Sequence, residues 1–153
     1  MRYSLLMAGR TGRRRDPKLE RLSQVSLFSG CTKSELKLVG SSVDEIEVPA
    51  GKVLIRQGQP GRECFVIVEG RATAAIRGKG SYGMGPGTCF GEMSLLDSEP
   101  RSATVTADTD MRLLVLGSRE FSTLVSRVPN VALRVMSSLA QRVRQAERAQ
   151  PHH

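Results

Sequence analysis

The residues best suited to bind a ligand lie in one stretch between positions 87 and 105. Gly91 comes directly before a short segment of helical character, and a glycine there lets the backbone approach a ligand closely. The backbone N–H groups at a helix start, here those of residues 92–94, favour an anion. The stretch therefore predicts one half of a cradle for a phosphate group.

The residues after this segment predict the other half. Pro100 ends the short helix, and Arg101 at the start of the next strand can offer its planar guanidinium to two phosphate oxygens. Ser102 adds a hydroxyl donor beside it. A carboxylate repels a phosphate, so Glu92 fits only if it accepts hydrogen bonds from neutral hydroxyls such as those of a ribose. The pattern is typical of a site for a compact ligand with sugar hydroxyls and a phosphate.

Each of these residues also has a purely structural interpretation. Glu92 could be a favourable charge at a helix start, and Gly91 an ordinary turn glycine. Arg101 could be a surface partner of Asp97 or Glu99. The combination in one order, rather than any single residue, favours the ligand site.

The elements around this stretch are predicted from apolar periodicity. Helical spacings between Pro17 and Leu38 predict two short helices, and Thr32 to Glu35 has the form of a capping box. After Ser42 the pattern changes to short β-rich stretches cut by Gly and Pro, which indicates an antiparallel sandwich or barrel. The strands expected are Glu45–Val48, Val53–Arg56, Cys64–Val68, Ala72–Arg77, Ala103–Ala107 and Arg112–Leu116.

Two helices are expected at the C-terminal end. Ser118 is the expected N-cap of a helix that runs to Pro129, and a last helix starts near Asn130. In this last helix a single apolar seam is predicted, with members 4, 3, 4 and 3 residues apart: Ala132, Met136, Leu139, Val143 and Ala146. The seam could pack on the sheet, cover a pocket, or pair with a second copy of the chain.

Composition bounds the class of protein. A chain of 153 residues with 39% hydrophobic residues fits one domain with an aliphatic core. No apolar run approaches the roughly 20 residues that cross a bilayer, so we expect a cytoplasmic protein with no membrane contact. Cys31, Cys64 and Cys89 are odd in number and widely spaced, which supports neither a disulfide framework nor a zinc site.

The net charge of +8 belongs to the two ends of the chain, since residues 22–126 carry slightly more acidic than basic residues. We expect a flexible basic arm over residues 1–17, one folded domain over 18–148 and a disordered tail over 149–153. The β-rich part is expected at about 43–117 and the last helices at about 118–148. An inert β-scaffold whose basic tails bind nucleic acid is an alternative, but the tails lack interleaved aromatic residues and a recognition helix.

Residues 90–105 resemble the phosphate-binding cassette of the cyclic-nucleotide-binding domain family. That cassette has the pattern F-G-E-x-[SAG]-L, a short turn, then P-R-[SAT]-A-x-V. This sequence has Phe90 to Leu95 and Pro100 to Val105 in that order, without a break. The resemblance extends to Leu27-Phe28, to residues 49–58 and to residues 65–70, and it covers about residues 19–145.

The resemblance implies an α+β, mainly β fold: an eight-stranded antiparallel β-roll, jelly-roll-like, with N-terminal helices, a short cassette helix and C-terminal helices. It implies that Glu92 receives the ribose 2′-hydroxyl and that Arg101 and Ser102 hold the cyclic phosphate. The ligand-binding residues it implies are Phe90, Gly91, Glu92, Met93, Ser94, Arg101, Ser102 and Ala103. A lid over the base is expected from Leu139 or Val143, because purine stacking needs an apolar cover.

Within this family Ser102 stands where the bacterial catabolite activator protein carries serine and where cAMP-dependent kinase regulatory subunits tend to carry alanine. Threonine is typical of cGMP-dependent kinases, so the sequence favours cAMP over cGMP, although a serine hydroxyl could also contact a guanine amino group. No helix-turn-helix, kinase, channel or acyltransferase segment follows, and the histidines are confined to His152 and His153. We therefore expect a stand-alone regulatory module, not an enzyme, with no cofactor or metal, that acts on a separate protein and could dimerise through its last helix.

Overall fold

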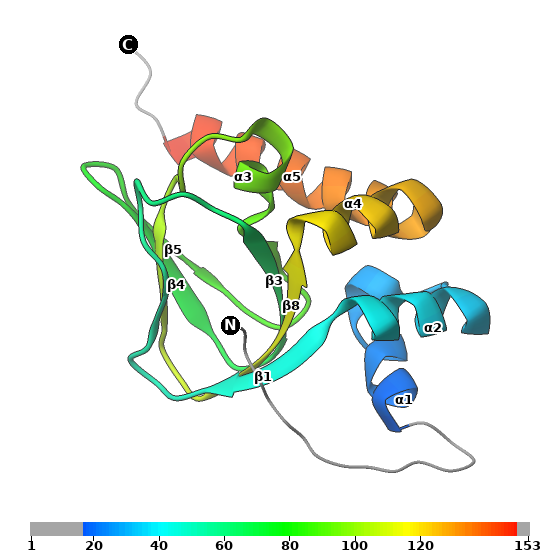
Figure 1. Cartoon of the computed structure of the whole chain (residues 1–153). Helices are drawn as coiled ribbons and strands as arrows, with labels where there is room; N and C mark the ends of the chain where they lie inside the picture. Colours follow the sequence, from blue (N-terminus) through cyan, green and yellow to red (C-terminus); the bar gives the residue numbers. More distant parts are fainter. Residues whose placement is uncertain (1–16, 150–153) are drawn as a thin grey trace.

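The computed structural model describes residues 17–149 of the chain, so the predicted arm and tail lie almost entirely outside the described residues. Two antiparallel sheets form a β-roll, with helices at one end and across the top (Figure 1). The helices are α1 (Pro17–Ser23), η1 (Ser26–Phe28), α2 (Lys33–Ser42), α3 (Glu92–Asp97), α4 (Ser118–Arg127) and α5 (Pro129–Ala149). The strands are β1 (Asp44–Val48), β2 (Val53–Ile55), β3 (Glu63–Glu69), β4 (Ala72–Ile76), β5 (Gly80–Met84), β6 (Cys89–Phe90), β7 (Thr104–Ala107) and β8 (Met111–Gly117).

The strand order explains how the cassette is held. One sheet has the order β1-β8-β3-β6 and the other the order β2-β7-β4-β5, and every neighbouring pair is antiparallel. The cassette leaves the first sheet at β6, forms α3, and enters the second sheet at β7. It therefore bridges the two sheets at one end of the roll. The expected fold class, an eight-stranded antiparallel β-roll with flanking helices, is confirmed.

Strand β3 shows how the sequence divides the core. Phe65 and Ile67 point between the two sheets, while Cys64 and Val66 point toward the helices. Because successive side chains of a strand alternate between its faces, an apolar run such as this one lets a single strand be buried on both sides. The first core fills the roll, and the second attaches the helices to it.

The observed helix ends agree in part with those predicted from the sequence. Thr32 caps α2, where its hydroxyl accepts from the Glu35 N–H and the Glu35 carboxylate accepts from the Thr32 N–H, so the predicted capping box is confirmed. The N-cap of α4 is Gly117, one position earlier than the predicted Ser118, which is instead the first helical residue. No helix between residues 17 and 149 combines the length and apolar character needed to span a membrane.

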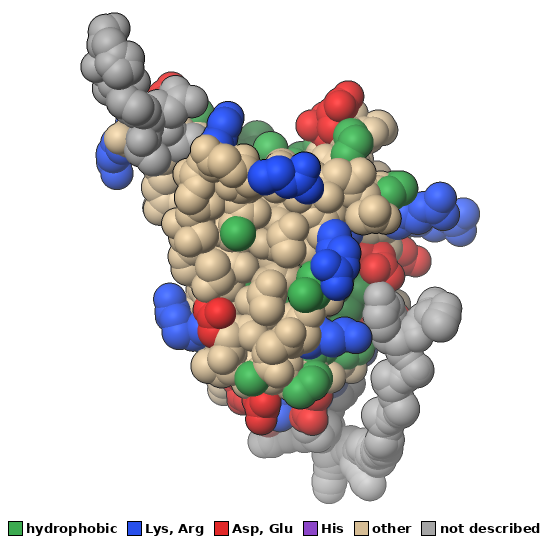
Figure 2. All heavy atoms as spheres, turned by 90° about the vertical axis from the view of Figure 1, so that its left-hand side faces the viewer, with side chains coloured by type: hydrophobic (Ala, Val, Ile, Leu, Met, Phe, Trp, Pro, Cys, Tyr) green, Lys and Arg blue, Asp and Glu red, His purple; other side chains and the backbone are tan. Residues whose placement is uncertain are grey.

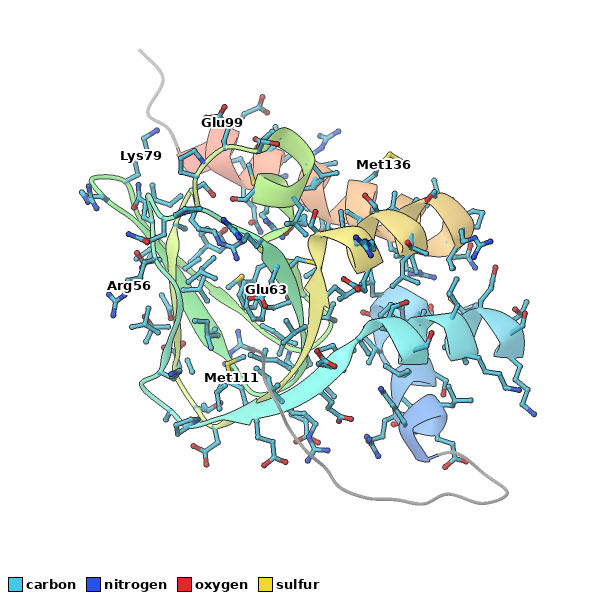
Figure 3. The ribbon with its side chains drawn as sticks, in the orientation of Figure 1. Arg56, Glu63, Lys79, Glu99, Met111 and Met136 are labelled. Carbon is cyan, nitrogen blue, oxygen red and sulfur yellow. The ribbon has the colours of Figure 1, made fainter. Side chains whose placement is uncertain are left out.

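The predicted seam of α5 does not lie on one face. Leu139 packs against the helix core together with Val131 and Val135, whereas Met136 and Val143 are 56% and 58% exposed. Figure 3 shows Met136 on the face of α5 that points away from the β-roll. The helix therefore carries an inner and an outer apolar stripe, and only the inner one packs on the body of the domain.

Candidate functional site

The cassette helix α3 is fixed at both ends by left-handed backbone. Gly91 is its N-cap with φ 86°, and Ser98 is its C-cap with φ 62°. A glycine is needed at the first position for a second reason, because a Cβ there would lie 2.9 Å from Arg101 Nη1 and 3.2 Å from the Glu63 carbonyl. The turn thus brings the start of α3 against the arginine that follows it in the cassette.

Arg101 holds the cassette to the β-roll. Its side chain is largely buried, with 7% of the residue exposed. Nη1 donates to the Gly91 carbonyl at 2.9 Å, and Nη2 donates to the Glu63 carbonyl at 2.8 Å. Because these carbonyls belong to α3's N-cap and to β3, the planar guanidinium is oriented before any ligand arrives.

Glu92, the first residue of α3, is fully buried and faces a basic residue that the sequence did not single out. Arg142 Nη2 of α5 lies 2.9 Å from Glu92 Oε2, and the same nitrogen donates to the Cys89 carbonyl. Neither carboxylate oxygen has a hydrogen bond of good geometry among the described residues. The carboxylate is therefore held mainly by the charge of Arg142, which leaves it able to accept from an added hydroxyl.

Burial raises the pKa of the Glu92 carboxyl above its ordinary value, because the charged form loses its hydration. The positive charge of Arg142 acts in the opposite direction, and the charge of Arg101 adds to it. Desolvation has the larger effect, so the net shift is upward. A carboxyl that is buried, only partly compensated and next to a cavity is typical of a functional site.

The predicted site residues converge on one cavity of about 30 Å³. Of the eight predicted residues, Glu92 alone is not in its wall, and the other seven are Phe90, Gly91, Met93, Ser94, Arg101, Ser102 and Ala103. Glu92 meets the cavity through its partner Arg142, which does line it. Seven of the predicted residues thus lie together around one cavity, whose volume is far below the roughly 300 Å³ of a typical small-molecule site.

Several cavity residues were missed by the sequence reasoning. The opposite wall comes from the second sheet and consists of Ile55, Ala74, Tyr82, Met84 and Val105. The residue that α5 contributes is Arg142. Neither Leu139 nor Val143, the predicted lid residues, lines the cavity, since Leu139 packs on the helix core and Val143 faces solvent. An apolar lid over a bound base stays a prediction.

Other kinds of site find no support in the part of the chain that is described. No three His, Cys, Asp or Glu side chains of residues 17–149 gather as metal ligands would. Figure 2 shows the face on the left of Figure 1, where Lys and Arg side chains are separated from one another and do not form one continuous basic patch. This face therefore lacks the continuous basic patch that nucleic-acid binding usually needs.

Comparison with known proteins agrees with this geometry. The sequence pattern of the family described as "Cyclic nucleotide-binding domain" matches residues 45–128. The cyclic nucleotide-gated potassium channel mll3241 of Mesorhizobium japonicum is 47% identical over 111 residues, which cover 72% of this chain and 31% of the channel. The cyclic AMP receptor protein of Thermus thermophilus is 34% identical over 126 residues, which cover 79% of this chain and 58% of that protein.

A solved structure supports the same relationship. The crystal structure of the Thermus thermophilus catabolite activator protein superposes with a TM-score of 0.68 at 34% identity, over 79% of this chain and 59% of that one. The chain spans 31% of the length of the channel and 58% of the length of the receptor protein. The cassette, the β-roll and the family pattern coincide on the same residues, and the chain therefore belongs to the cyclic nucleotide-binding domain family.

Proposed function

We propose that this domain is a cytoplasmic cAMP sensor that changes conformation on binding and acts on a separate protein. The observation that carries the proposal is that Arg101 lines a single cavity and that Glu92 pairs with Arg142 in the wall of the same cavity. Arg101 supplies a planar donor for the cyclic phosphate, and Glu92 supplies an acceptor for the ribose 2′-hydroxyl. Members of this family are regulatory rather than catalytic, so we propose no enzymatic activity.

Selection of the base is proposed to fall to the cavity residues beyond the cassette. Ser102 lines the cavity, and its hydroxyl could serve the phosphate or an exocyclic group of a base. Tyr82 and Met84 of β5 offer apolar surface on the facing wall. We propose adenine as the base, and guanine is the alternative that the binding experiment below tests.

The switch is proposed to pass through Arg142. The cavity is too small for a cyclic nucleotide, so its walls must move before a ligand can enter. Arg142 is the cavity residue that belongs to α5, and it pairs with the Glu92 carboxylate, to which the ribose would bind. Because Arg142 is part of the wall that has to move, we propose that a ligand that engages Glu92 shifts Arg142, and with it the C-terminal half of α5.

The outer stripe of α5 is proposed to serve a second copy of the chain. Leu133, Met136 and Val143 are each more than half exposed and are separated by three and seven residues. This is the spacing of a short helix-pairing seam. A homodimer of this kind predicts a mass that falls to that of the monomer on dilution, and a concentration-independent monomer mass would refute it.

Isothermal titration calorimetry with cAMP and cGMP, side by side, tests the proposed ligand. Saturable micromolar binding of cAMP that is tighter than that of cGMP supports the proposal. A clear preference for cGMP would replace the ligand but keep the mechanism, and no binding of either would refute the sensor function. Filter binding of DNA at rising salt serves as the counter-test, because affinity that falls steeply with salt indicates phosphate-backbone contacts.

A further inference from the structure

The loop between β2 and β3 packs against Arg101. The Arg101 N–H donates to the Gln59 carbonyl at 2.8 Å, and the Gly58 N–H donates to the Arg101 carbonyl at 2.9 Å. Beyond this pair the loop reaches Gly61, which lines an open cleft of about 330 Å³ on the outer side of the cassette. The loop therefore supports both the backbone and the side chain of the arginine.

Gly61 leaves no room for a side chain. A Cβ built there would lie 2.7 Å from Arg101 Cζ and 2.8 Å from Arg101 Nε. It would also lie 2.6 Å from the Cβ of Ser94 on α3. Carbon atoms in van der Waals contact are about 3.5–4.0 Å apart, so at least one of these groups would have to move.

The requirement for glycine at this position is steric and not conformational. The φ of Gly61 lies outside the left-handed region, so an alanine could adopt its backbone without strain. Gly91 also lies against Arg101, but its φ of 86° would confound any substitution there. Gly61 is thus the position at which contact with the arginine can be tested without a change in backbone conformation.

Displacing the guanidinium has a defined consequence. Nη1 and Nη2 are each bonded to a carbonyl, so a shift away from Gly61 must lengthen or break these bonds. We propose that Gly61 is a positioning residue, which by lacking a side chain keeps Arg101 in the orientation needed to bind the cyclic phosphate. This inference rests on the cyclic-nucleotide-binding function proposed above. It adds a loop outside the cassette to the determinants of affinity.

The test is a double-mutant cycle on cAMP affinity measured by calorimetry. Gly61→Ala is expected to weaken cAMP binding by about tenfold or more, the loss expected when charge-assisted hydrogen bonds are misplaced. In the Arg101→Ala background the same change is expected to cost less than about twofold, because the group on which it acts is gone. Equal losses in both backgrounds, or no loss in either, would overturn the proposal.

Gly83→Ala is the matched control. Gly83 also has a φ outside the left-handed region, and a Cβ there would meet nothing closer than Arg71 Nη2 at 3.7 Å. The cAMP affinity of Gly83→Ala is expected to stay within about twofold of that of the wild type. A tenfold loss of cAMP affinity in this control would mean that any added methyl group perturbs the domain. The effect of Gly61→Ala would then not be specific to position 61, and the proposal would be overturned.

A second pair of variants separates the arginine from the helix. Ser94→Gly removes the contact with the α3 side chain, which is the shortest of the contacts that crowd Gly61→Ala. The inference requires Gly61→Ala/Ser94→Gly to bind cAMP more weakly than Ser94→Gly alone, whereas equal affinities would assign the effect to α3. The Nε–H resonance of Arg101, identified by its loss in Arg101→Ala, should also shift in ligand-free Gly61→Ala. This readout distinguishes a failed positioning role from a protein that does not bind cAMP.

Discussion

The pair between Arg142 and Glu92 gives the sharpest test of the site, because it places an ion pair between the cassette and α5. Arg142→Ala would leave a carboxylate that is 0% exposed without its partner, whereas the arginine itself is 18% exposed. Removing one partner of a fully buried pair costs about 3–5 kcal/mol, and a contact to a charged group about 1.5–3 kcal/mol. Since Arg142 keeps some access to water, we expect a loss of about 2 kcal/mol in the free energy of unfolding.

Urea denaturation at neutral pH of the wild type, Arg142→Ala, Glu92→Gln and the double variant measures this loss and its origin. The two substitutions should not be additive, with a coupling energy of at least about 1 kcal/mol, because the double variant buries no unpaired charge. Arg144→Ala is the control, since that exposed side chain lies two residues away on the same helix. The reasoning is refuted if Arg142→Ala is as stable as Arg144→Ala or if the coupling energy is close to zero.

The same pair sets the pH dependence of stability. The pKa of Glu92 is raised in the folded state by burial, so the native protein holds this proton more tightly than the unfolded chain. The contribution is fully present below the ordinary pKa of 4.5 and is lost as the pH rises through the raised value. Wild-type stability relative to Glu92→Gln should therefore fall with rising pH across this window. In Arg142→Ala the window should extend to higher pH, because the charge that lowers the pKa is removed.

Three further predictions concern the ligand. Arg101→Ala should weaken cAMP binding about ten- to a hundredfold, and Arg101→Lys should restore part of the affinity. Calorimetry measures the loss of affinity, and a melting curve measures separately the stability lost with the contacts to the Gly91 and Glu63 carbonyls. Glu92→Gln should shrink the preference for cAMP over its 2′-deoxy analogue by about 1 kcal/mol, and an unchanged preference would assign Glu92 a purely structural role. Hydrogen exchange of residues 136–148 should slow when cAMP binds, because a bound purine gives α5 a new surface to cover, and faster exchange would instead mean that Arg142 leaves the site.

The cassette could be predicted from sequence because its chemistry is local. Gly91, Arg101 and Ser102 lie within twelve residues of one another, and the short helix α3 between two strands keeps them close in space. Strand β5 was not predicted, because it depends on pairing with another strand. Two of its five residues are glycines, so its sequence shows little β character, and pairing with β4 supplies what the sequence lacks.

Arg142 could not be found in the same way, because it is fifty residues from Glu92 in the sequence and reaches the site only through the packing of α5. The helix has two apolar stripes, and spacing alone does not say which is buried. One signal was available: Val131, Val135 and Leu139 form the inner stripe, and Arg142 extends it by one more turn. A charged residue that continues a buried stripe has to find a partner, and a lone carboxylate at a helix start is a suitable one.

The positions of the two arginines give a physical reason for the domain to couple its ligand to α5. Gly91 and Glu92 are neighbours in the sequence, yet Arg101 binds the carbonyl of the first and Arg142 pairs with the carboxylate of the second. Arg101 is anchored to β3 through the Glu63 carbonyl, whereas Arg142 belongs to α5. A ligand whose phosphate engages one arginine, and whose hydroxyl competes with the other for Glu92, changes both attachments in a single binding event. Ligands that carry only a phosphate or only a sugar lack this double engagement, so their binding should leave α5 closer to its unliganded position.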